Sequence, residues 1–379
     1  MLIKGEPIRV ACIMGNWFGG GVEAVVMNYY RNIDRTKIQF DFFCSEESTD
    51  IPYKEIESMG GKVVLIPSYS KLIKYQKELK RIFTEGNYQI VHSHISTMSI
   101  FPLRVATKVG IPIRIAHSHS TTSIKEKKKN IMKQILRNFS KIYANNYFCC
   151  SELAGRWLFG NRTYDDGKVF LVNNAIDLTK FTFNSKIRKE KRIELGIDDD
   201  TLVIGHIGRF VKQKNHDFLI DIFNEIHMKN ENSLLFLAGQ GPLQNELSNK
   251  VKELKLENSV KFLGQRSDTN DLYQAFDIFL LPSLYEGLPV VGIEAQASGL
   301  LCVFSNNVTK ETKILKSTQC IPLSFNEKKW SEIILDSYNV FLRSECSDEI
   351  AKKGFNIKDE AIKLERKYYQ LIQMQEIKI

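Results

Sequence analysis

One stretch, residues 275–303 (AFDIFLLPSLYEGLPVVGIEAQASGLLCV), most constrains how this chain can fold. The apolar run 278–281 is too short for a helix and stops at Pro282, so it predicts a buried strand. Polar turn residues follow, and residues 290–297 then suit a helix that ends before Gly299. Strand, tight polar loop and helix in this order favour an open parallel sheet, in which such a loop lies at the carboxyl edge where ligands bind.

Two carboxylates bracket this loop, Glu286 within it and Glu294 about two turns into the predicted helix. Between them, the backbone ahead of the first helical turn offers N–H groups suited to an anion or to sugar hydroxyls. The candidate binding positions there are Gly287, Leu288, Pro289 and Val290.

The whole pattern, P-S-x-x-E-G-x-x-x-x-x-x-E-A-x-A-x-G, resembles the donor-site signature of the retaining family 4 glycosyltransferases, which have the GT-B fold. The resemblance implies that Glu286 contacts the transferred sugar and that Glu294 binds the ribose of the nucleotide. The alternative is a solvated loop carboxylate and a helix-surface carboxylate, and the complete motif context favours the site. Leu300-Leu301 departs from the family pattern, which often has a proline here, and this affects the turn more than the chemistry.

Length and composition predict two soluble domains. The chain has 379 residues, 26% of them charged and 43% hydrophobic, which allows an ample core. No unbroken apolar run reaches about 18 residues, so we expect neither a signal peptide nor a membrane span. The seven cysteines form no C-x-x-C pair, which is typical of reduced, buried thiols in a cytoplasmic protein.

Alternating strand and helix patterns fill the N-terminal half and predict a parallel, doubly wound α/β sheet. The first strand pattern, residues 8–14, leads into Gly20-Gly21-Val22-Glu23 and a helix. This loop resembles the G-G-x-E loop of the family, which faces the donor diphosphate and the acceptor. The resemblance therefore places Gly20 and Gly21 at the donor and Glu23 on the acceptor side, whereas a glycine cluster alone is equally typical of a flexible turn.

Two later strand patterns end in His-x-His, at His92-Ser93-His94 and His117-Ser118-His119. Period two puts both histidines of each pair on one face, a spacing that could chelate a metal ion. Further clustered ligands are not evident, because the remaining histidines are scattered in the sequence, so we expect no metal site. The resemblance instead makes His117 the residue beside the sugar and the acceptor, with His119 as its neighbour. We expect His92 and His94 to be hydrogen-bonded strand-end residues.

The basic excess lies in the N-terminal half, where residues 1–180 carry 26 Lys and Arg against 16 Asp and Glu. Residues 123–147 concentrate it in an amphipathic helical pattern that begins with Lys125, Lys127, Lys128 and Lys129. We expect its apolar face to pack on the sheet and this lysine cluster to contact an anionic membrane. The alternative is an ordinary solvated helix. We expect no nucleic-acid partner, because the chain contains no recognised nucleic-acid-binding module.

In the C-terminal half, a predicted strand over 202–207 leads into Gly208-Arg209 and, five residues later, Lys214. This segment resembles the family's G-R-x-x-x-x-K motif, which implies that Arg209 and Lys214 grip the nucleotide diphosphate. The physics agrees, because fixed cations stabilise the charge that a leaving diphosphate gains as the glycosidic bond breaks.

The domain boundaries follow from the same resemblance. Residues 1–177 would form the acceptor-binding domain, and residues 178–358 the nucleotide-sugar-binding domain, with a linker around 178–200. A terminal helix over 359–379 would cross back to the first domain. The GT-B fold implies two facing Rossmann-like domains with a cleft between them.

The resulting expectation is a retaining glycosyltransferase that uses a nucleotide-sugar, most simply a UDP-sugar, without any cofactor or metal. Its acceptor would be a glycan or a polyprenyl-diphosphate-linked saccharide for a cell-surface polysaccharide, reached at the inner face of the membrane. Two alternatives keep the fold, a sugar-nucleotide epimerase and a phosphorylase. A non-catalytic sugar-nucleotide-binding protein would need no acceptor-side histidine, so His117 argues against it.

Overall fold

The computed structural model describes residues 6–17, 19–119 and 127–377. The chain divides into two compact units: unit 1 comprises Met1–Ala175 and Asn356–Ile379, and unit 2 comprises Ile176–Phe355. The boundaries expected from the sequence, 177/178 and 358/359, lie two and three residues away. Within the described residues, no helix is long and apolar enough to cross a membrane.

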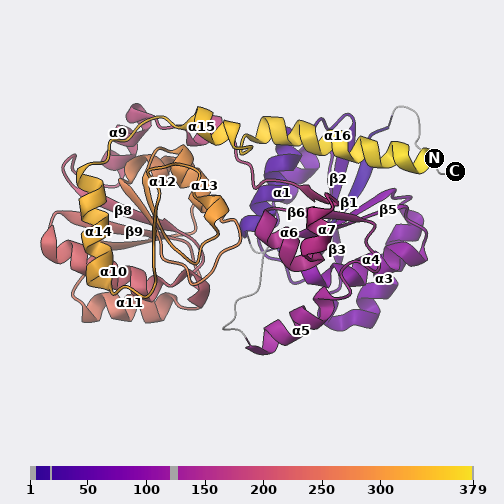
Figure 1. Cartoon of the computed structure of the whole chain (residues 1–379), viewed down its shortest axis with the longest axis horizontal. Coiled ribbons are helices and arrows are strands. Elements are labelled where there is room, and N and C mark those ends of the chain that lie inside the picture. The colour runs from indigo at the N-terminus through magenta and orange to yellow at the C-terminus, as the bar shows by residue number, and fades with distance from the viewer. Residues whose placement is uncertain (1–5, 18, 120–126, 378–379) are drawn as a thin grey trace. The chain divides into compact units, whose positions relative to one another are not determined.

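Unit 1 is built on a parallel sheet of seven described strands in the order β3-β2-β1-β4-β5-β6-β7 (Figure 1). The strands are β1 Ile8–Gly15, β2 Ile38–Ser45, β3 Lys62–Ile66, β4 Ile90–Ser93, β5 Ile113–Ser118, β6 Asn146–Cys149 and β7 Val169–Leu171. The helices are α1 Gly21–Asn32, α2 Tyr53–Ser58, α3 Leu72–Glu85, α4 Ile100–Lys108, α5 Lys127–Arg137, α6 Glu152–Phe159, α7 Asn161–Asp165 and α16 Ile357–Glu376, with 3₁₀ turns η1 Tyr69–Lys71 and η2 Ser96–Ser99.

Unit 2 repeats this architecture with a parallel sheet of six described strands in the order β10-β9-β8-β11-β12-β13. The strands are β8 Leu202–Ile207, β9 Ser233–Ala238, β10 Val260–Gly264, β11 Ile278–Leu281, β12 Leu301–Ser305 and β13 Gln319–Ile321. The helices are α8 Leu178–Phe181, α9 Ser185–Glu194, α10 His216–Lys229, α11 Gln244–Glu253, α12 Thr269–Ala275, α13 Val290–Ala297, α14 Glu327–Asn339 and α15 Ser347–Lys352, with 3₁₀ turns η3 Lys212–Lys214 and η4 Lys310–Thr312.

The apolar runs of the sequence become the central strands, and this confirms the predicted fold class. Every residue of β8, β11 and β12 is buried, as expected for strands covered on both faces. The stretch that opened the sequence analysis folds as predicted: β11 covers residues 278–281 and α13 covers residues 290–297. Gly299 takes φ +67°, and a Cβ there would lie 2.3 Å from the carbonyl oxygen of Ser344, so both the backbone conformation and the packing require glycine.

Each sheet has a switch point, the place where the strand order reverses and where doubly wound folds bind ligands. In unit 1 this point lies between β1 and β4, and in unit 2 it lies between β8 and β11. The predicted site loops follow these four strands: the Gly20-Gly21 loop follows β1, the first histidine pair ends β4, and the Arg209 and Glu286 loops follow β8 and β11. The topology therefore places these loops at the switch point of their unit, with His117 and His119 one strand away at the end of β5.

The segment expected to be a linker is instead an ordered part of unit 2. Residues 178–200 contain α8 and α9, and two arginines of α9 are joined to the sheet. Arg188 Nη2 lies 2.6 Å from Asp277 Oδ1, and Arg192 donates to the carbonyl oxygens of Thr201 and Ala275. A polar, charged composition indicated a loop here, but these charges pair with the start of β11 and with the backbone ahead of β8.

The basic segment also differs from its expectation. The apolar residues predicted to pack α5 on the sheet are exposed instead, and Figure 1 shows α5 at the margin of unit 1, away from the strands. The exposed side chains are Ile131, Met132, Ile135, Phe139 and Ile142. Tyr143 from the same pattern does pack against the core of unit 1, but α5 ends at Arg137. The helix is therefore shorter than the predicted segment, and the predicted direction of its apolar residues was wrong.

The C-terminal helix α16 belongs to unit 1, where it lies along α1 (Figure 1). Of its apolar residues, Leu364, Tyr368 and Leu371 are buried, while Ile362 is exposed.

All seven cysteines are free thiols, as expected, and five of them are buried.

Candidate active site

In unit 2, the loops after β8 and β11 are joined by a network centred on Glu286. Lys214 Nζ lies 2.7 Å from Glu286 Oε1, and Ser283 Oγ donates to the same oxygen at 3.0 Å. Gln213 Nε2 donates to Glu286 Oε2 at 3.1 Å and to the carbonyl oxygen of Tyr285 at the same distance. Backbone bonding adds to this, since Leu284 N donates to Gln213 O at 2.8 Å. The Glu286 carboxylate is therefore held in one place before a ligand arrives.

The two cations predicted for a diphosphate differ in their surroundings. Arg209 is exposed, and within the described part of the chain no hydrogen bond or ion pair is found for its guanidinium. Lys214 is largely buried, with 16% of its side chain exposed. Its ammonium group has three donors, so it can keep Glu286 and still donate to a phosphate oxygen.

A second loop, after β9, supports the backbone around Arg209. Gly208 N donates to Ala238 O, and Phe210 N donates to Gln240 O, both at 2.9 Å. A Cβ at Gly239 would lie 2.1 Å from the carbonyl oxygen of Gly208, so only glycine permits this approach. The turn after β9, Gly239-Gln240-Gly241-Pro242, thus positions the loop that carries Arg209.

Glu294 is anchored by a residue that the sequence analysis missed. It lies on the second turn of α13, where Tyr273 of α12 donates from its Oη to Glu294 Oε2 at 2.9 Å. Burial raises the pKa of Glu294 to about 7, and the Tyr273 hydrogen bond partly opposes this by favouring the ionised form. A carboxyl group with this pKa changes charge near neutral pH, which is unusual for glutamate and typical of functional sites. In the sequence, Tyr273 looks like an ordinary core aromatic residue.

The other predicted donor positions lie where α13 begins. The side chains of Leu288, Pro289 and Val290 are buried, whereas Gly287 is partly exposed. These residues are therefore suited to contact a ligand through the backbone rather than through their side chains, with Pro289 offering no N–H. Glu286 forms an isolated parallel bridge with Val308, which ties the loop to the segment after β12.

In unit 1, the two His-x-His pairs come together because β4 and β5 are neighbours in the sheet. The rings of each pair stack, with centroids 4.1 Å apart for His92 and His94 and 3.9 Å apart for His117 and His119. Across the strands, His92 Nε2 lies 3.0 Å from His117 Nδ1, and His94 Nδ1 lies 3.0 Å from His119 Nε2. The sequence analysis treated the pairs separately, and the structure makes them one four-histidine cluster.

The C-terminal helix completes this cluster. Tyr368 Oη lies 2.7 Å from His92 Nδ1. If Tyr368 donates this hydrogen bond, His92 donates in turn to His117, and the outer nitrogen Nε2 of His117 carries the proton. If Tyr368 accepts it, His117 Nε2 presents a lone pair. The tautomer of His117 is therefore coupled to a phenol 251 residues further along the chain, which no local sequence signal could indicate.

All four imidazoles are buried, and burial holds their pKa values below the usual range, to about 3 for His119. They are therefore neutral at neutral pH. The buried Nε2 atoms of His94 and His117 have no hydrogen-bond partner among the described residues. A cavity of about 10 Å³, room for about one water molecule, adjoins the cluster.

The cluster also has the ligand type of a transition-metal site. Single nitrogens of His92, His94 and His117 lie within 4.8 Å of one another. The sequence analysis found no third ligand for either pair, and the pairing of β4 with β5 supplies one. The rest of the cavity lining is phenolic and apolar, namely Val25, Val26, Tyr29, Phe40, Val172, Leu364 and Tyr368. The imidazoles hydrogen-bond in pairs, but this leaves Nε2 of His94 and Nε2 of His117 without a partner among the described residues, so both nitrogens are open to a water molecule or an ion.

The predicted loop after β1 lies at the start of α1. Gly20 precedes the first helical residue, Gly21, and a Cβ on Gly20 would lie 2.9 Å from Glu23 Oε2. The Glu23 carboxylate therefore folds back over the start of its own helix, where an anion is favourable. Of the lysines expected at a membrane, Lys125 lies outside the described residues, while Lys127, Lys128 and Lys129 form the first turn of α5.

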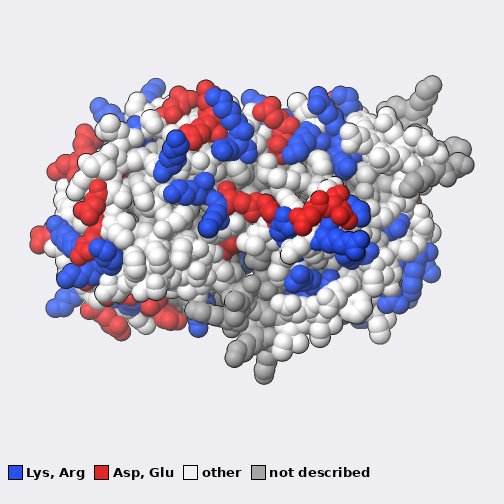
Figure 2. All heavy atoms as spheres, in the orientation of Figure 1, with Lys and Arg blue, Asp and Glu red and all other residues white. Residues whose placement is uncertain are grey.

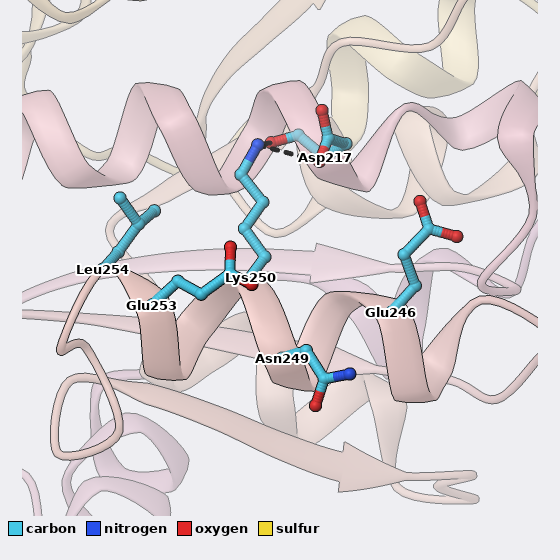
Figure 3. Close-up of a pocket in the computed structure, with 6 residues that line it drawn as sticks. All are labelled: Asp217, Glu246, Asn249, Lys250, Glu253 and Leu254. Atoms are coloured by element: carbon cyan, nitrogen blue, oxygen red, sulfur yellow. Dashed lines mark hydrogen bonds and ion pairs between the residues drawn. The ribbon is translucent and has the colours of Figure 1, made fainter.

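Two further features of unit 2 lie outside the predicted set. His206 and His216, which look scattered in the sequence, pack edge to face with centroids 4.6 Å apart, and burial lowers the pKa of both. A surface hollow of about 440 Å³ lies between α10 and α11. Figure 3 shows Lys250 reaching across it to Asp217, with Glu246 and Glu253 on the same side as Lys250. Three carboxylates and one lysine in its lining disfavour an anionic ligand such as a diphosphate.

Comparison with known proteins identifies the family. The family profile described as Glycosyltransferase Family 4 matches residues 19–180, and the profile Glycosyl transferases group 1 matches residues 187–336. The putative glycosyltransferase EpsF of Bacillus subtilis is 35% identical over 332 residues, which cover 86% of this chain and 86% of that protein. The UDP-Gal:alpha-D-GlcNAc-diphosphoundecaprenol alpha-1,3-galactosyltransferase of Escherichia coli is 26% identical over 315 residues, covering 79% of this chain and 80% of that protein.

Solved structures share the fold. The crystal structure of HepE from Anabaena with UDP-glucose aligns with a TM-score of 0.72 at 18% identity, covering 97% of each chain. A sucrose-phosphate synthase from Thermosynechococcus elongatus aligns with a TM-score of 0.77 at 17% identity, covering 97% of this chain and all of that one. Two profile matches and a relative 35% identical over most of its length show that the chain belongs to glycosyltransferase family 4 and is a glycosyltransferase of the GT-B fold.

Proposed function

We propose that this glycosyltransferase moves a sugar from a UDP-sugar to a glycan or a lipid-linked saccharide in the synthesis of a surface polysaccharide, with retention of anomeric configuration. The observation that carries the proposal is the network at the switch point of unit 2, where Lys214 and Glu286 form an ion pair beside the loop of Arg209. It offers two cations for a diphosphate and a held carboxylate for a sugar. The relatives support the choice of donor, since the E. coli protein is named for UDP-Gal and HepE was crystallised with UDP-glucose.

The roles of the residues follow from the charges. Arg209 and Lys214 neutralise the diphosphate, and their effect grows as the leaving group gains charge in the transition state. Glu294 accepts hydrogen bonds from the ribose, and Glu286 orients the transferred sugar. The chain presents no evident nucleophile in this network, so we propose displacement on one face of the sugar, with the leaving diphosphate helping to take the acceptor proton.

In this proposal the acceptor meets unit 1. His117 and His119 are neutral and buried, and Nε2 of His117 has no partner among the described residues. The proposal therefore requires that an acceptor hydroxyl reaches this nitrogen through the small cavity beside it. Glu23, Gly20 and Gly21 lie after β1 at the same switch point. The phosphate charge is neutralised by Arg209 and Lys214, so the proposed transfer uses neither a divalent ion nor another cofactor.

The direct test is incubation with a panel of nucleotide-sugars, first alone and then with membrane lipids that carry saccharide diphosphates. We expect UDP release to depend on the lipid-linked acceptor, and NMR of the product to show the anomeric configuration of the donor. Release of UDP without any acceptor would indicate an epimerase. Turnover with a sugar phosphate and a glycan would indicate a phosphorylase, and binding without turnover in any mixture would indicate a non-catalytic protein.

An acceptor on a lipid carrier would bring the enzyme to a membrane. We therefore propose a peripheral, salt-sensitive contact between the basic segment that contains Lys125, Lys127, Lys128 and Lys129 and anionic lipid at the inner face of the cell membrane. Each lysine near such a surface contributes about 1 kcal/mol, which salt screens.

A further inference from the structure

The histidine cluster of unit 1 has two nitrogens that its own hydrogen bonds leave open. His92 pairs with His117, and His94 pairs with His119, across strands β4 and β5. The Nε2 atoms of His94 and His117 are buried and have no hydrogen-bond partner among the described residues. Both residues line the same cavity of about 10 Å³. Because an unpaired buried polar atom is costly, two of them beside one cavity indicate a ligand there.

A third imidazole lies within reach of the same point. Single nitrogens of His92, His94 and His117 lie within 4.8 Å of one another. The nitrogens around a tetrahedral zinc ion lie about 2.0–2.1 Å from it and therefore about 3.3–3.4 Å from one another. The three rings must draw together to bind an ion, and rotation about the Cβ–Cγ bond of histidine is soft enough to allow this. Three imidazoles and one open position are the coordination of zinc sites that also hold a water molecule.

The hydrogen bonds behind these rings suit ligands of a metal ion. A metal-bound histidine donates a hydrogen bond from its other ring nitrogen, which fixes the ring and its tautomer. His92 Nδ1 lies 2.7 Å from Tyr368 Oη, and His94 Nδ1 lies 3.0 Å from His119 Nε2, so Nε2 of His92 and of His94 can carry the lone pair. Burial lowers the pKa values of the three rings, so no proton has to leave them before they bind an ion. Binding through His92 Nε2 would replace its hydrogen bond with His117.

The type of ligand decides which ion fits. Imidazole nitrogen suits Zn²⁺, Co²⁺, Ni²⁺ and Cu²⁺, whereas Mg²⁺ and Ca²⁺ prefer oxygen ligands. The described residues that line the cavity include no carboxylate, so a divalent ion there would have no counter-ion from the lining. A zinc-bound water relieves part of this charge, because its pKa falls to about 7 and it loses a proton to solvent. The remaining charge favours reversible binding over a permanently held ion.

We propose that His92, His94 and His117 bind one divalent transition-metal ion, with Zn²⁺ as the reference ion, and that the bound ion inhibits sugar transfer. The inhibition rests on the proposed function, because the ion occupies Nε2 of His117, the nitrogen that the acceptor hydroxyl would need. The ion takes no part in the proposed reaction, so the metal-free enzyme transfers sugar and added Zn²⁺ stops it. Zn²⁺ should therefore compete with the acceptor and not with the donor.

Binding is tested on the full chain without nucleotide, after dialysis against EDTA and then against metal-free buffer. Co²⁺ is the spectroscopic probe, because its visible absorption depends on the ligands and on the coordination number. We expect this absorption to saturate at one ion per chain, and Zn²⁺ to displace the Co²⁺. Figure 2 shows Asp and Glu side chains at many places on the face that it draws, so weak binding to surface carboxylates is expected as well. Mg²⁺ measures that background, and it should leave the Co²⁺ absorption unchanged.

The first variant is His94→Asn. Asparagine keeps an amide near the position of Nδ1, so it can still donate to His119, but it has no group at the position of Nε2. We expect this variant to lose the saturable Co²⁺ absorption. Tyr368→Phe removes the partner of His92 Nδ1 and should weaken binding by about 10–100-fold.

The matched control is His227→Gln, which replaces a partly buried histidine of unit 2 that hydrogen-bonds to Ser233 and Ser259. It should bind Co²⁺ like the wild type. Thermal unfolding without metal shows whether each variant is folded. Zn²⁺ should raise the unfolding temperature of the wild type and of His227→Gln, and it should not raise that of His94→Asn.

Each outcome decides the site or the inhibition. Absence of saturable binding in the folded wild type, or equal binding in folded His94→Asn, would overturn the site. In transfer assays, Zn²⁺ should raise the apparent KM for the acceptor in the wild type and have little effect in His94→Asn. Equal inhibition of both proteins would overturn the inhibitory role.

The result is also separable from that of the proposed function. Sugar transfer by a chain that binds no ion would overturn the inference and keep the function. Saturable binding of one ion by a chain that transfers sugar to no acceptor would keep the metal site, and the proposed function would fail together with the inhibition that rests on it.

Discussion

Lys214 Nζ lies 2.7 Å from Glu286 Oε1, so the cation proposed for the diphosphate and the carboxylate proposed for the sugar form one ion pair. Both side chains are largely buried, with exposed fractions of 16% and 9%. The pair therefore belongs to the folding of the loops as well as to the proposed binding. Arg209, in contrast, is exposed on the loop after β8, so we expect it to serve the proposed binding and not the folding of the loop.

We predict that Arg209→Ala lowers turnover by about a hundredfold and leaves the unfolding free energy unchanged, because only the diphosphate needs the guanidinium. Lys214→Met should lower turnover and also cost about 2 kcal/mol of stability, because it leaves the Glu286 carboxylate buried without its cation. Urea unfolding and steady-state kinetics measure both quantities. In Lys214→Met/Glu286→Gln the stability should partly return. If Arg209→Ala unfolds early and keeps its rate per folded molecule, Arg209 is structural.

Glu286→Gln should reduce sugar transfer while UDP binding persists, since the proposed contact of Glu286 is to the sugar. The amide keeps the shape of the side chain, and its oxygen can still accept from Ser283, but the ion pair with Lys214 is lost and the amide NH2 faces the donor Gln213 Nε2. We therefore expect some loss of stability, which urea unfolding measures, and compare rates per folded molecule. Calorimetry with UDP and transfer assays with the complete donor give the two numbers. An equal loss in both would remove the distinction between Glu286 and Glu294.

Donor binding should strengthen as the pH rises through about 7, the pKa of Glu294. The ionised carboxylate accepts both ribose hydroxyls, and protonation removes that capacity, so affinity should fall by up to about tenfold for each pH unit below the pKa. Calorimetry with a UDP-sugar between pH 6 and 8 measures this.

Tyr273→Phe removes a donor to the ionised form of Glu294, which raises the pKa of Glu294 and moves the pH dependence of donor binding to higher pH. In Glu294→Gln, donor affinity should no longer depend on pH in this range. Glu294→Ala should weaken the free energy of nucleotide binding by about 1.5–3 kcal/mol. UDP affinity unchanged in Glu294→Ala would take Glu294 out of the site.

His117→Ala should lower transfer and spare UDP binding, because the histidine cluster belongs to unit 1 and the proposed donor site to unit 2. Tyr368→Phe should lower transfer less and alter the tautomer of His117, which the ¹⁵N chemical shifts of the imidazole report. A wild-type rate in His117→Ala would move the acceptor-side role to His119 or elsewhere. An unchanged tautomer in Tyr368→Phe would show that the Tyr368–His92 hydrogen bond does not control His117.

Dialysis against EDTA should leave the transfer rate unchanged, because Arg209 and Lys214 carry the proposed phosphate charge. Metal analysis of the purified protein accompanies the assay. Loss of activity that a divalent ion restores would contradict this prediction. The first variants to examine would then be His92→Ala, His94→Ala and His117→Ala, since nitrogens of these three residues lie within 4.8 Å of one another.

The elements that could be predicted from the sequence are those whose cause is local. The apolar run before Pro282 could only be a buried strand, and α13 had to end near Gly299, so β11 and α13 appear where they were predicted. The same reasoning placed Arg209, Lys214 and Glu286 in loops after parallel strands, because strand ends are marked by the change from apolar to polar residues. Between residue 305 and the predicted terminal helix the patterns are weak, and β13, α14 and α15 were not predicted from the sequence.

Only the tertiary structure decided which of these pieces touch. Strand order brings β4 beside β5 and makes one cluster of two histidine pairs, and the return of the chain after residue 355 adds Tyr368 to it. Tyr273 became the partner of Glu294 through helix packing in unit 2. The periodicity of residues 131–142 showed an apolar face but not its direction, since that depends on contacts with distant residues, such as those of Ser140 and Lys141 with Leu158 and Thr163 just after α5. Local pattern thus specifies elements and their ends, and long-range packing specifies faces and neighbours.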